Sequence, residues 1–95
     1  MNSIDQKLKD LISLVEKLRA PDGCDWDRKQ TSETLIPYLL EESHEVVEAI
    51  LENKPSLLRE ELGDLLLNIV FQAVLASEKK EFTMGEVIDD INKKI

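Results

Sequence analysis

The stretch Glu61–Ala76, with the sequence ELGDLLLNIVFQAVLA, decides the fold of this chain. Eleven of its sixteen residues are apolar, and one more is a glycine. The polar remainder has spacings of three, four and four residues, which places it on one narrow stripe of a helix: Glu61, Asp64, Asn68 and Gln72. A helix that is apolar on nearly every other side is expected to be buried on those sides. In a chain of 95 residues, such burial implies a second subunit.

Further helices are predicted on both sides of this stretch, because apolar residues recur at helical spacing between short breaks. Two of the helices open with the spacing of a capping box, in which the side chains of a Ser or Thr and of a Glu or Gln three residues later satisfy free backbone N–H groups. Residues 21–27 contain a proline, a glycine and three aspartates, and they are predicted as an irregular loop. The predicted helices cover residues 3–20 with the capping box Ser3-Gln6, residues 32–52 with Pro37 near the start, residues 56–78, and residues 83–95 with the capping box Thr83-Glu86. We therefore predict an all-α fold of four helices with short connections.

The composition argues against several kinds of partner. A net charge of −8 disfavours a nucleic-acid backbone or an anionic membrane surface. No apolar stretch approaches the roughly 20 residues that a membrane span requires. Cys24 is the only cysteine, and the first five residues lack the basic and apolar parts of a signal peptide. We expect a cytoplasmic protein, for which a polyanionic small molecule bridged by metal ions is a possible partner.

Two acidic clusters have helical spacing. Glu41, Glu42 and Glu45 lie on the second predicted helix, and Glu61 and Asp64 lie on the third. If the two helices pack side by side, their carboxylates meet and repel one another, by roughly 1 kcal/mol at about 4 Å in water and about 4 kcal/mol at an effective dielectric near 20. A divalent cation removes this repulsion, and ligands that are all oxygen suit Mg²⁺ or Mn²⁺. The two clusters together predict a magnesium site.

Projection of the second predicted helix separates its acids into two sets. One set forms a polar stripe that a solvated helix face would also explain: Glu41, Glu45, Glu48 and Glu52. Glu42 lies off this stripe, beside Ala49 on the border of the apolar arc. Glu61 and Asp64 are harder to explain by solvation, because their helix has little other polar surface. A solvated face and a metal site both stay open for the first cluster, whereas the second cluster favours a metal site.

Other motifs have alternatives. Glu41-x-x-His44 has the spacing of half a carboxylate-bridged di-iron site, but such a site requires a second histidine and His44 is the only one. His44 is therefore predicted to be a helix-surface residue. Trp26 is either a core plug that anchors its loop or an aromatic platform for a nucleobase.

Taken together, these residues resemble the all-α nucleoside triphosphate pyrophosphohydrolases. Glu41-Glu42-Ser43-His44-Glu45, followed by Glu61-Leu62-Gly63-Asp64, matches the EExxE…ExxD signature of that superfamily. The loop GCDWDRKQT at residues 23–31, with Pro37-Tyr38 before the acids, is similar to the MazG branch in particular. The resemblance covers residues 4–95, and it departs from the family at Asp25, where MazG proteins more often carry proline.

The resemblance implies Mg²⁺-dependent hydrolysis of nucleoside triphosphates to the monophosphate and pyrophosphate, as in nucleotide-pool house-cleaning. It implies metal ligands at Glu42, Glu45, Glu61 and Asp64. Glu41 matches a position that supports the ligands or activates the attacking water. For the substrate, the resemblance implies contacts from Trp26, Gln30, Thr31 and Asn68.

The resemblance also implies a four-helix bundle completed by dimerisation or a higher oligomer. We expect a single MazG-like domain over residues 1–95, either as a short natural form or as the N-terminal part of a longer protein. Two alternatives stay open beside the enzyme. One is a non-catalytic helical module that keeps the acids and binds nucleotide or metal only, and the other is a helical dimerisation domain without a ligand.

Overall fold

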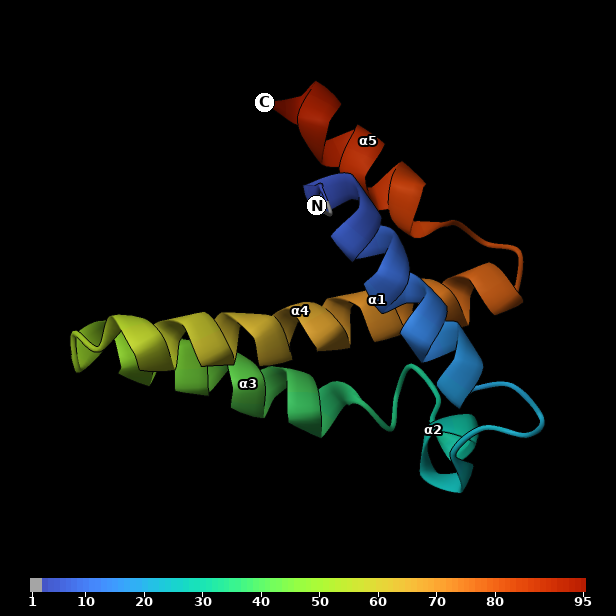
Figure 1. The fold of residues 1–95 in the computed structure, drawn as a ribbon, viewed down its shortest axis with the longest axis horizontal. Coiled ribbons are helices and arrows are strands. Elements are labelled where there is room, and N and C mark those ends of the chain that lie inside the picture. Colours follow the sequence, from blue (N-terminus) through green and yellow to red (C-terminus); the bar gives the residue numbers. More distant parts are fainter. Residues whose placement is uncertain (1–2) are drawn as a thin grey trace. The chain divides into compact units, whose positions relative to one another are not determined.

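The computed structural model describes residues 3–95, and within that range every regular element is a helix (Figure 1). This confirms the all-α prediction. The helices are α1 (Ile4–Leu18), α2 (Asp25–Lys29), α3 (Ile36–Leu51), α4 (Pro55–Glu78) and α5 (Met84–Lys94). They form two compact units, one made of residues up to Lys29 with Val70–Ile95 and the other of Gln30–Ile69. None of the helices between Ser3 and Ile95 is long and apolar enough to cross a membrane.

Helix α2 corrects the sequence analysis, which predicted an irregular loop over residues 21–27. The second half of that segment is helical, and the backbone N–H of Arg28 donates to the carbonyl of Cys24 over 3.0 Å. The last carbonyls of such a short helix have no partner within it. Here the guanidinium of Arg19 donates to the carbonyl oxygens of Asp27 at 2.6 Å and of Arg28 at 3.3 Å. Because that partner lies outside the segment, the local sequence does not show what satisfies the end of the helix.

The helix starts follow the predicted caps with one difference. Thr83 and Glu86 form both halves of a capping box at the start of α5. At α1, the Ser3 side chain accepts a hydrogen bond from the backbone N–H of Gln6 at 3.2 Å. The Gln6 side chain, however, donates to Asp10 one turn further on, at 2.8 Å. Helices α1 and α5 therefore begin at the predicted caps, whereas α3 begins at Ile36 and not at residue 32 as predicted.

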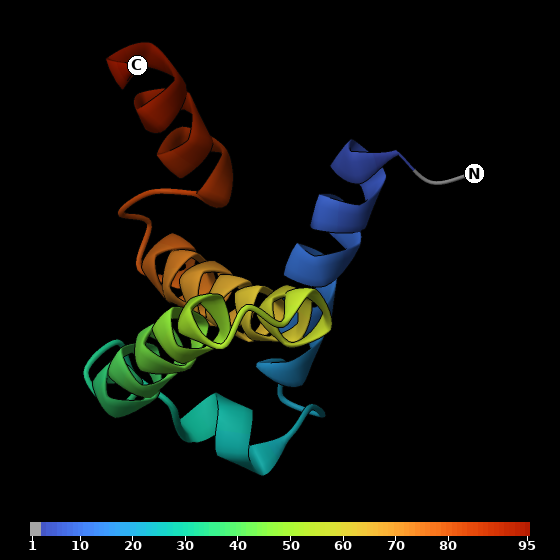
Figure 2. The same ribbon diagram turned by 90° about the vertical axis from the view of Figure 1, so that its left-hand side faces the viewer.

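In the unit Gln30–Ile69, helix α3 and the first part of α4 lie alongside each other and run in opposite directions (Figures 1 and 2). Pro37 lies in the first turn of α3, where its missing N–H has no helical partner to lose. The chain reverses between the two helices at Asn53, whose φ of 56° is the left-handed conformation that asparagine tolerates well. Ala49 of α3 is buried. This hairpin carries both acidic clusters.

The other unit has its core around α1 and the second half of α4. Its buried side chains are Val15, Val70, Phe71, Ala73, Val74, Leu75 and Ala76. Arg19, which directly follows α1, forms an ion pair with Glu78 at the end of α4, with 2.6 Å between Arg19 Nε and Glu78 Oε2. The α1 end and the α4 end are thereby fixed to each other.

Helix α4 is not buried all round in the single chain, although its sequence predicts that it should be. Its second half supplies most of the buried residues, whereas four apolar residues of its first half are 39–48% exposed: Leu62, Leu66, Leu67 and Ile69. Leu66 and Leu67 follow Gly63 by three and four residues, so these three positions share one face of the helix. One chain leaves this face uncovered.

Candidate functional site

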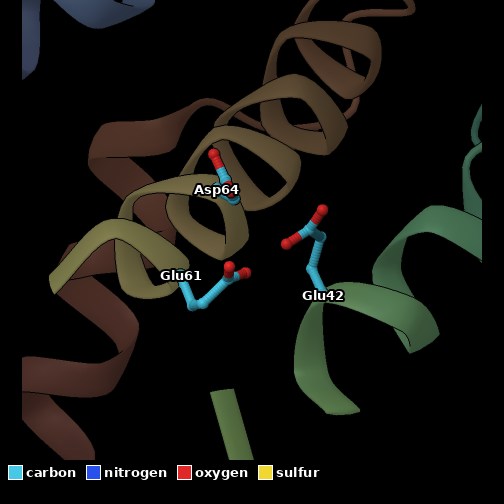
Figure 3. Close-up of side chains that lie close together, drawn as sticks. All are labelled: Glu42, Glu61 and Asp64. Atoms are coloured by element: carbon cyan, nitrogen blue, oxygen red, sulfur yellow. The ribbon is translucent and has the colours of Figure 1, made fainter. Parts of the chain in front are cut away.

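Three carboxylates converge between α3 and α4 in the unit Gln30–Ile69. The Glu42 side chain points from α3 toward Glu61 and Asp64 of α4 (Figure 3). One carboxylate oxygen from each residue lies within 4.8 Å of those of the other two. Glu61 and Asp64 are three residues apart, which puts them on the same face of α4. Among residues 3–95, this is the one group of three or more His, Cys, Asp or Glu side chains arranged closely enough to hold a metal ion.

Glu42 carries an unsatisfied atom. Its Oε2 is shielded from solvent and has no hydrogen-bond partner. A shielded carboxylate oxygen that lacks a partner costs more free energy than a neutral polar atom, because it has lost its water without gaining a replacement. The site therefore has a place for a positively charged ligand. An all-oxygen donor set next to an orphaned carboxylate oxygen fits Mg²⁺.

The pKa values of Glu42 and Glu61 also fit a site for a positively charged ligand. Desolvation raises the pKa of Glu42, and the charge of Asp64 raises it further, while a hydrogen bond with Glu61 partly opposes both. Desolvation and then the charges of Glu42 and Asp64 raise the pKa of Glu61. The two carboxyls therefore hold protons more tightly than isolated glutamates do. A bound cation would reverse this effect, because it favours the charged form of each acid.

Glu45 and Glu41 lie outside the group of three. The half-buried Glu45 is close enough that its charge contributes to the raised pKa values of Glu42 and Glu61. Glu41 is exposed, and its charge contributes to the raised pKa of Glu42. The structure thus gathers three of the four predicted ligands and places the fourth nearby.

His44 lies away from the acids of the site, as predicted for a helix-surface residue. It pairs with Glu48 one turn later on α3, with 3.1 Å between His44 Nε2 and Glu48 Oε1. Both side chains are exposed. The di-iron alternative gains no support from this arrangement.

Asn68 lies one turn after Asp64 on the same stripe of α4. Its side-chain amide donates to the backbone carbonyl of Asp64 at 3.1 Å, and the residue is half-buried. The amide group thus lies against the backbone of the helical turn that carries Asp64. Its predicted contact with the base or sugar stays a prediction.

Gln30 and Thr31 take part in a turn that leads into α3, together with Thr34. The backbone N–H of Thr31 donates to the Thr34 hydroxyl at 2.8 Å, and the N–H of Thr34 donates to the Thr31 hydroxyl at 3.2 Å. The Thr34 hydroxyl donates to Gln30 Oε1 at 2.8 Å. Sequence analysis missed Thr34, although Ser and Thr side chains often hydrogen-bond to nearby backbone N–H groups in turns. These contacts order the turn before α3, the helix that carries Glu42.

Trp26 belongs to the unit that contains α1 and α2. Its side chain is on α2 and is 48% exposed. Trp26 is therefore not fully covered within the described residues, and its role as a platform for a nucleobase stays a prediction. Arg19 and Glu78, which hold α2 and its neighbours, were not singled out by the sequence analysis, because no local motif contains them.

An all-helical chain that brings three carboxylates together from two adjacent helices defines a class: an all-α domain with a candidate site for a divalent cation. Comparison with known families makes this class specific. The MazG nucleotide pyrophosphohydrolase domain matches residues 30–95. The chain belongs to this family.

Individual relatives agree with this assignment. The "Nucleoside triphosphate pyrophosphohydrolase/pyrophosphatase MazG" of Thermotoga maritima is 52% identical over 87 residues, which cover 92% of this chain and 34% of that protein. The "Nucleoside triphosphate pyrophosphohydrolase" of Escherichia coli K12 is 42% identical over 96 residues, covering 100% of this chain and 35% of the relative. A protein of the same name from Mycobacterium tuberculosis is 37% identical over 92 residues, covering 95% and 28%. The chain spans about a third of the length of the first two relatives.

Proposed function

We propose that this domain hydrolyses nucleoside triphosphates to the monophosphate and pyrophosphate, with Mg²⁺ held by the carboxylates between α3 and α4. Two observations at Glu42 carry the proposal. Its Oε2 is shielded and has no hydrogen-bond partner, and one of its carboxylate oxygens lies within 4.8 Å of an oxygen of Glu61 and of Asp64. Membership of the MazG family, whose relatives carry the name nucleoside triphosphate pyrophosphohydrolase, supports the choice of reaction. Removal of unwanted nucleotides from the cellular pool is a role that this reaction would serve.

The net charge of the chain makes a cation necessary for this substrate. A triphosphate is a polyanion, and the chain has a net charge of −8 with a cluster of acids at the proposed site. Glu42, Glu61 and Asp64 would hold the ion, and Glu45 would complete the set from the next turn of α3. When bound, Mg²⁺ or Mn²⁺ supplies positive charge to the phosphate oxygens and lowers the pKa of a water molecule.

The remaining predicted residues have separate tasks in this proposal. Glu41, next to the ligand Glu42 and exposed, accepts a proton from the attacking water. Asn68 contacts the base or sugar through its amide group, and Trp26 offers a face for stacking. Gln30 and Thr31 help to bind the substrate through the segment that precedes α3.

Pyrophosphate release is the direct test of the proposal. The chain is incubated with Mg²⁺ and, in turn, each common nucleoside triphosphate and a set of damaged ones, and both products are measured. We expect pyrophosphate and monophosphate to form in equal amounts, and no activity after chelation of the metal. Absence of product from every substrate, with Mg²⁺ binding intact, would favour the non-catalytic module that keeps the metal site.

Mg²⁺ should stabilise the domain more at about pH 7.5 than at about pH 4. The raised pKa values of Glu42 and Glu61 mean that the folded chain binds more protons than the unfolded chain between the usual carboxyl pKa and the raised values. The free energy of unfolding therefore falls as the pH rises through that window. Above the window the cation relieves the repulsion, whereas below it protons already do so. Thermal unfolding with and without Mg²⁺ at the two pH values measures the effect, and an equal gain at both would contradict it.

We also propose that two or more copies of the chain assemble on the uncovered face of α4, as dimers or larger oligomers. Soluble monomers rarely expose a run of large apolar residues on one helix, and Leu62, Leu66 and Leu67 are all exposed here. The stretch Glu61–Ala76 of α4, which is apolar on nearly every side, supports such an assembly. Assembly would complete a bundle around the hairpin that holds the acids.

Leu66→Glu is expected to reduce the oligomer to a chain of 10.9 kDa. A charge at the centre of an apolar interface would lose its water without gaining a partner. Arg59→Glu is the matched control, because it places the same charge at an exposed polar position of the same helix. Analytical ultracentrifugation measures both masses. A wild-type chain that sediments as a monomer would reject the assembly.

A further inference from the structure

Arg19 joins three helices in the unit that contains α1, α2 and the end of α4. Its Nε and Nη2 donate to the two carboxylate oxygens of Glu78 at 2.6 and 2.7 Å. Its Nη1 donates to the carbonyl of Asp27 at 2.6 Å. The guanidinium carbon also lies 5.9 Å from the centre of the Phe71 ring. Only 12% of the Arg19 side chain is exposed, so the group is held on most sides.

The geometry makes this contact a clamp rather than a loose ion pair. A guanidinium is planar, and a bidentate carboxylate fixes the direction of its other N–H groups. Those groups point at the last carbonyls of α2, where a cation is also favoured by the helix dipole. A helix of five residues does not hold its shape by itself. The position of α2 therefore depends on Arg19.

A second set of contacts keeps α2 close to the end of α1. The Arg28 side chain donates to the carbonyl of Pro21 at 2.8 Å and forms an ion pair with Asp25. The backbone N–H of Cys24 donates to the carbonyl of Leu18 at 2.9 Å. These contacts fix the start of α2, and Arg19 fixes its end.

Both partners of the clamp stay charged over the pH range in which an enzyme is assayed. The hydrogen bond with Glu78 raises the pKa of Arg19 despite its burial. The same hydrogen bond lowers the pKa of Glu78. The clamp is thus independent of pH near neutrality.

We propose that Arg19, held by Glu78, is a positioning residue that fixes α2 so that the partly exposed Trp26 is presented for stacking by a nucleobase. Trp26 directly precedes Asp27, whose carbonyl Arg19 holds at 2.6 Å, yet its own side chain is 48% exposed. A large aromatic side chain on a rigidly held backbone loses little conformational freedom when a ligand stacks on it. This inference rests on the proposed function, because it assigns a base-binding role within that reaction.

The test separates substrate binding from chemistry. Arg19→Lys keeps the charge but loses the bidentate fork, and Glu78→Gln removes the partner charge. Each is expected to raise KM about tenfold while kcat changes less than about twofold, because the acids that carry the chemistry are untouched. Arg59→Lys makes the same chemical change at an exposed arginine of α4 and should leave both constants unchanged.

Trp26 supplies a readout that does not need turnover. It is the only tryptophan in the chain, so the intrinsic fluorescence reports on it alone. In Arg19→Lys and Glu78→Gln, acrylamide should quench the fluorescence more strongly and its anisotropy should fall. In a Trp26→Ala background, Arg19→Lys should raise KM no further, because the two residues act as a unit.

Two results would overturn the inference. One is that the effects of Arg19→Lys and Trp26→Ala on KM are additive, and the other is that Trp26 quenching is unchanged in both Arg19→Lys and Glu78→Gln. Failure of the proposed function looks different, since the wild-type chain itself would then release no pyrophosphate. In that case the fluorescence measurements still decide whether Arg19 positions Trp26. Circular dichroism checks that the variants keep their helical content, and the Lys and Gln replacements were chosen to keep side-chain size close to the original.

Discussion

Glu42→Gln is expected to lower kcat/KM for triphosphate hydrolysis about a hundredfold or more and to weaken Mg²⁺ binding strongly. Glutamine has the shape of glutamate but neither its charge nor its second acceptor oxygen. In the wild type, the shielded Oε2 has no partner within residues 3–95, and glutamine puts an NH2 group in place of one of the two oxygens. The same change removes a desolvated charge from beside Glu61 and Asp64. The metal-free variant should therefore melt at a higher temperature than the metal-free wild type.

Loss of activity together with gain of stability distinguishes this prediction from simple damage to the fold. Thermal unfolding without metal measures the gain, and pyrophosphate release with Mg²⁺ measures the loss. Glu48→Gln is the matched control, because it removes an exposed carboxylate that pairs with His44 on the same helix. It should keep activity within about twofold of wild type. Full activity in Glu42→Gln would mean that the site assignment is wrong.

The acidic site was largely predictable from the sequence, because its geometry follows from helical periodicity. Glu61 and Asp64 form part of the only polar stripe on an otherwise apolar stretch, and Glu42 lies off the solvated stripe of its own helix. Both patterns relate residues about one helical turn apart, and the spacing in the sequence alone determines which of these residues share a face. The structure adds the packing of α3 alongside α4. With it comes the finding that Glu42 forms the close group with Glu61 and Asp64, whereas Glu45 lies outside that group.

The clamp at Arg19 was not predictable in the same way. Glu78 is 59 residues away in the sequence, and the carbonyls of α2 are bound by a side chain from outside that helix. No pattern of side-chain types within residues 21–29 indicates such a partner. The sequence analysis therefore predicted a loop where the structure has a helix. Long-range contacts of charged side chains depend on how the helices pack, and periodicity does not encode that packing.

Alanine substitutions at Gly23 and at Gly63 are expected to change the free energy of unfolding in opposite directions. A Cβ at Gly23 would lie 2.4 Å from the carbonyl oxygens of both Lys17 and Leu18, in the last turn of α1. Backbone atoms do not move aside cheaply, and α1 and the segment before α2 approach each other here. Gly23→Ala is expected to destabilise the fold by about 2–3 kcal/mol. For a domain of this size, that corresponds to a fall in Tm of roughly 10 °C or more.

Gly63 offers the opposite case, because a Cβ there meets no atom within 4 Å. It lies inside α4, where glycine is less favourable than alanine by about 1 kcal/mol. Gly63→Ala should therefore stabilise the single chain by about that amount. Since Gly63 shares a face with Leu66 and Leu67, the measurement is made in the Leu66→Glu background, in which a second copy is not expected to cover it. Urea unfolding gives both free energies. If Gly23→Ala leaves the stability unchanged, the end of α1 can move aside to make room for the methyl group. If Gly63→Ala lowers the stability, something other than a second copy approaches α4 closely at this position.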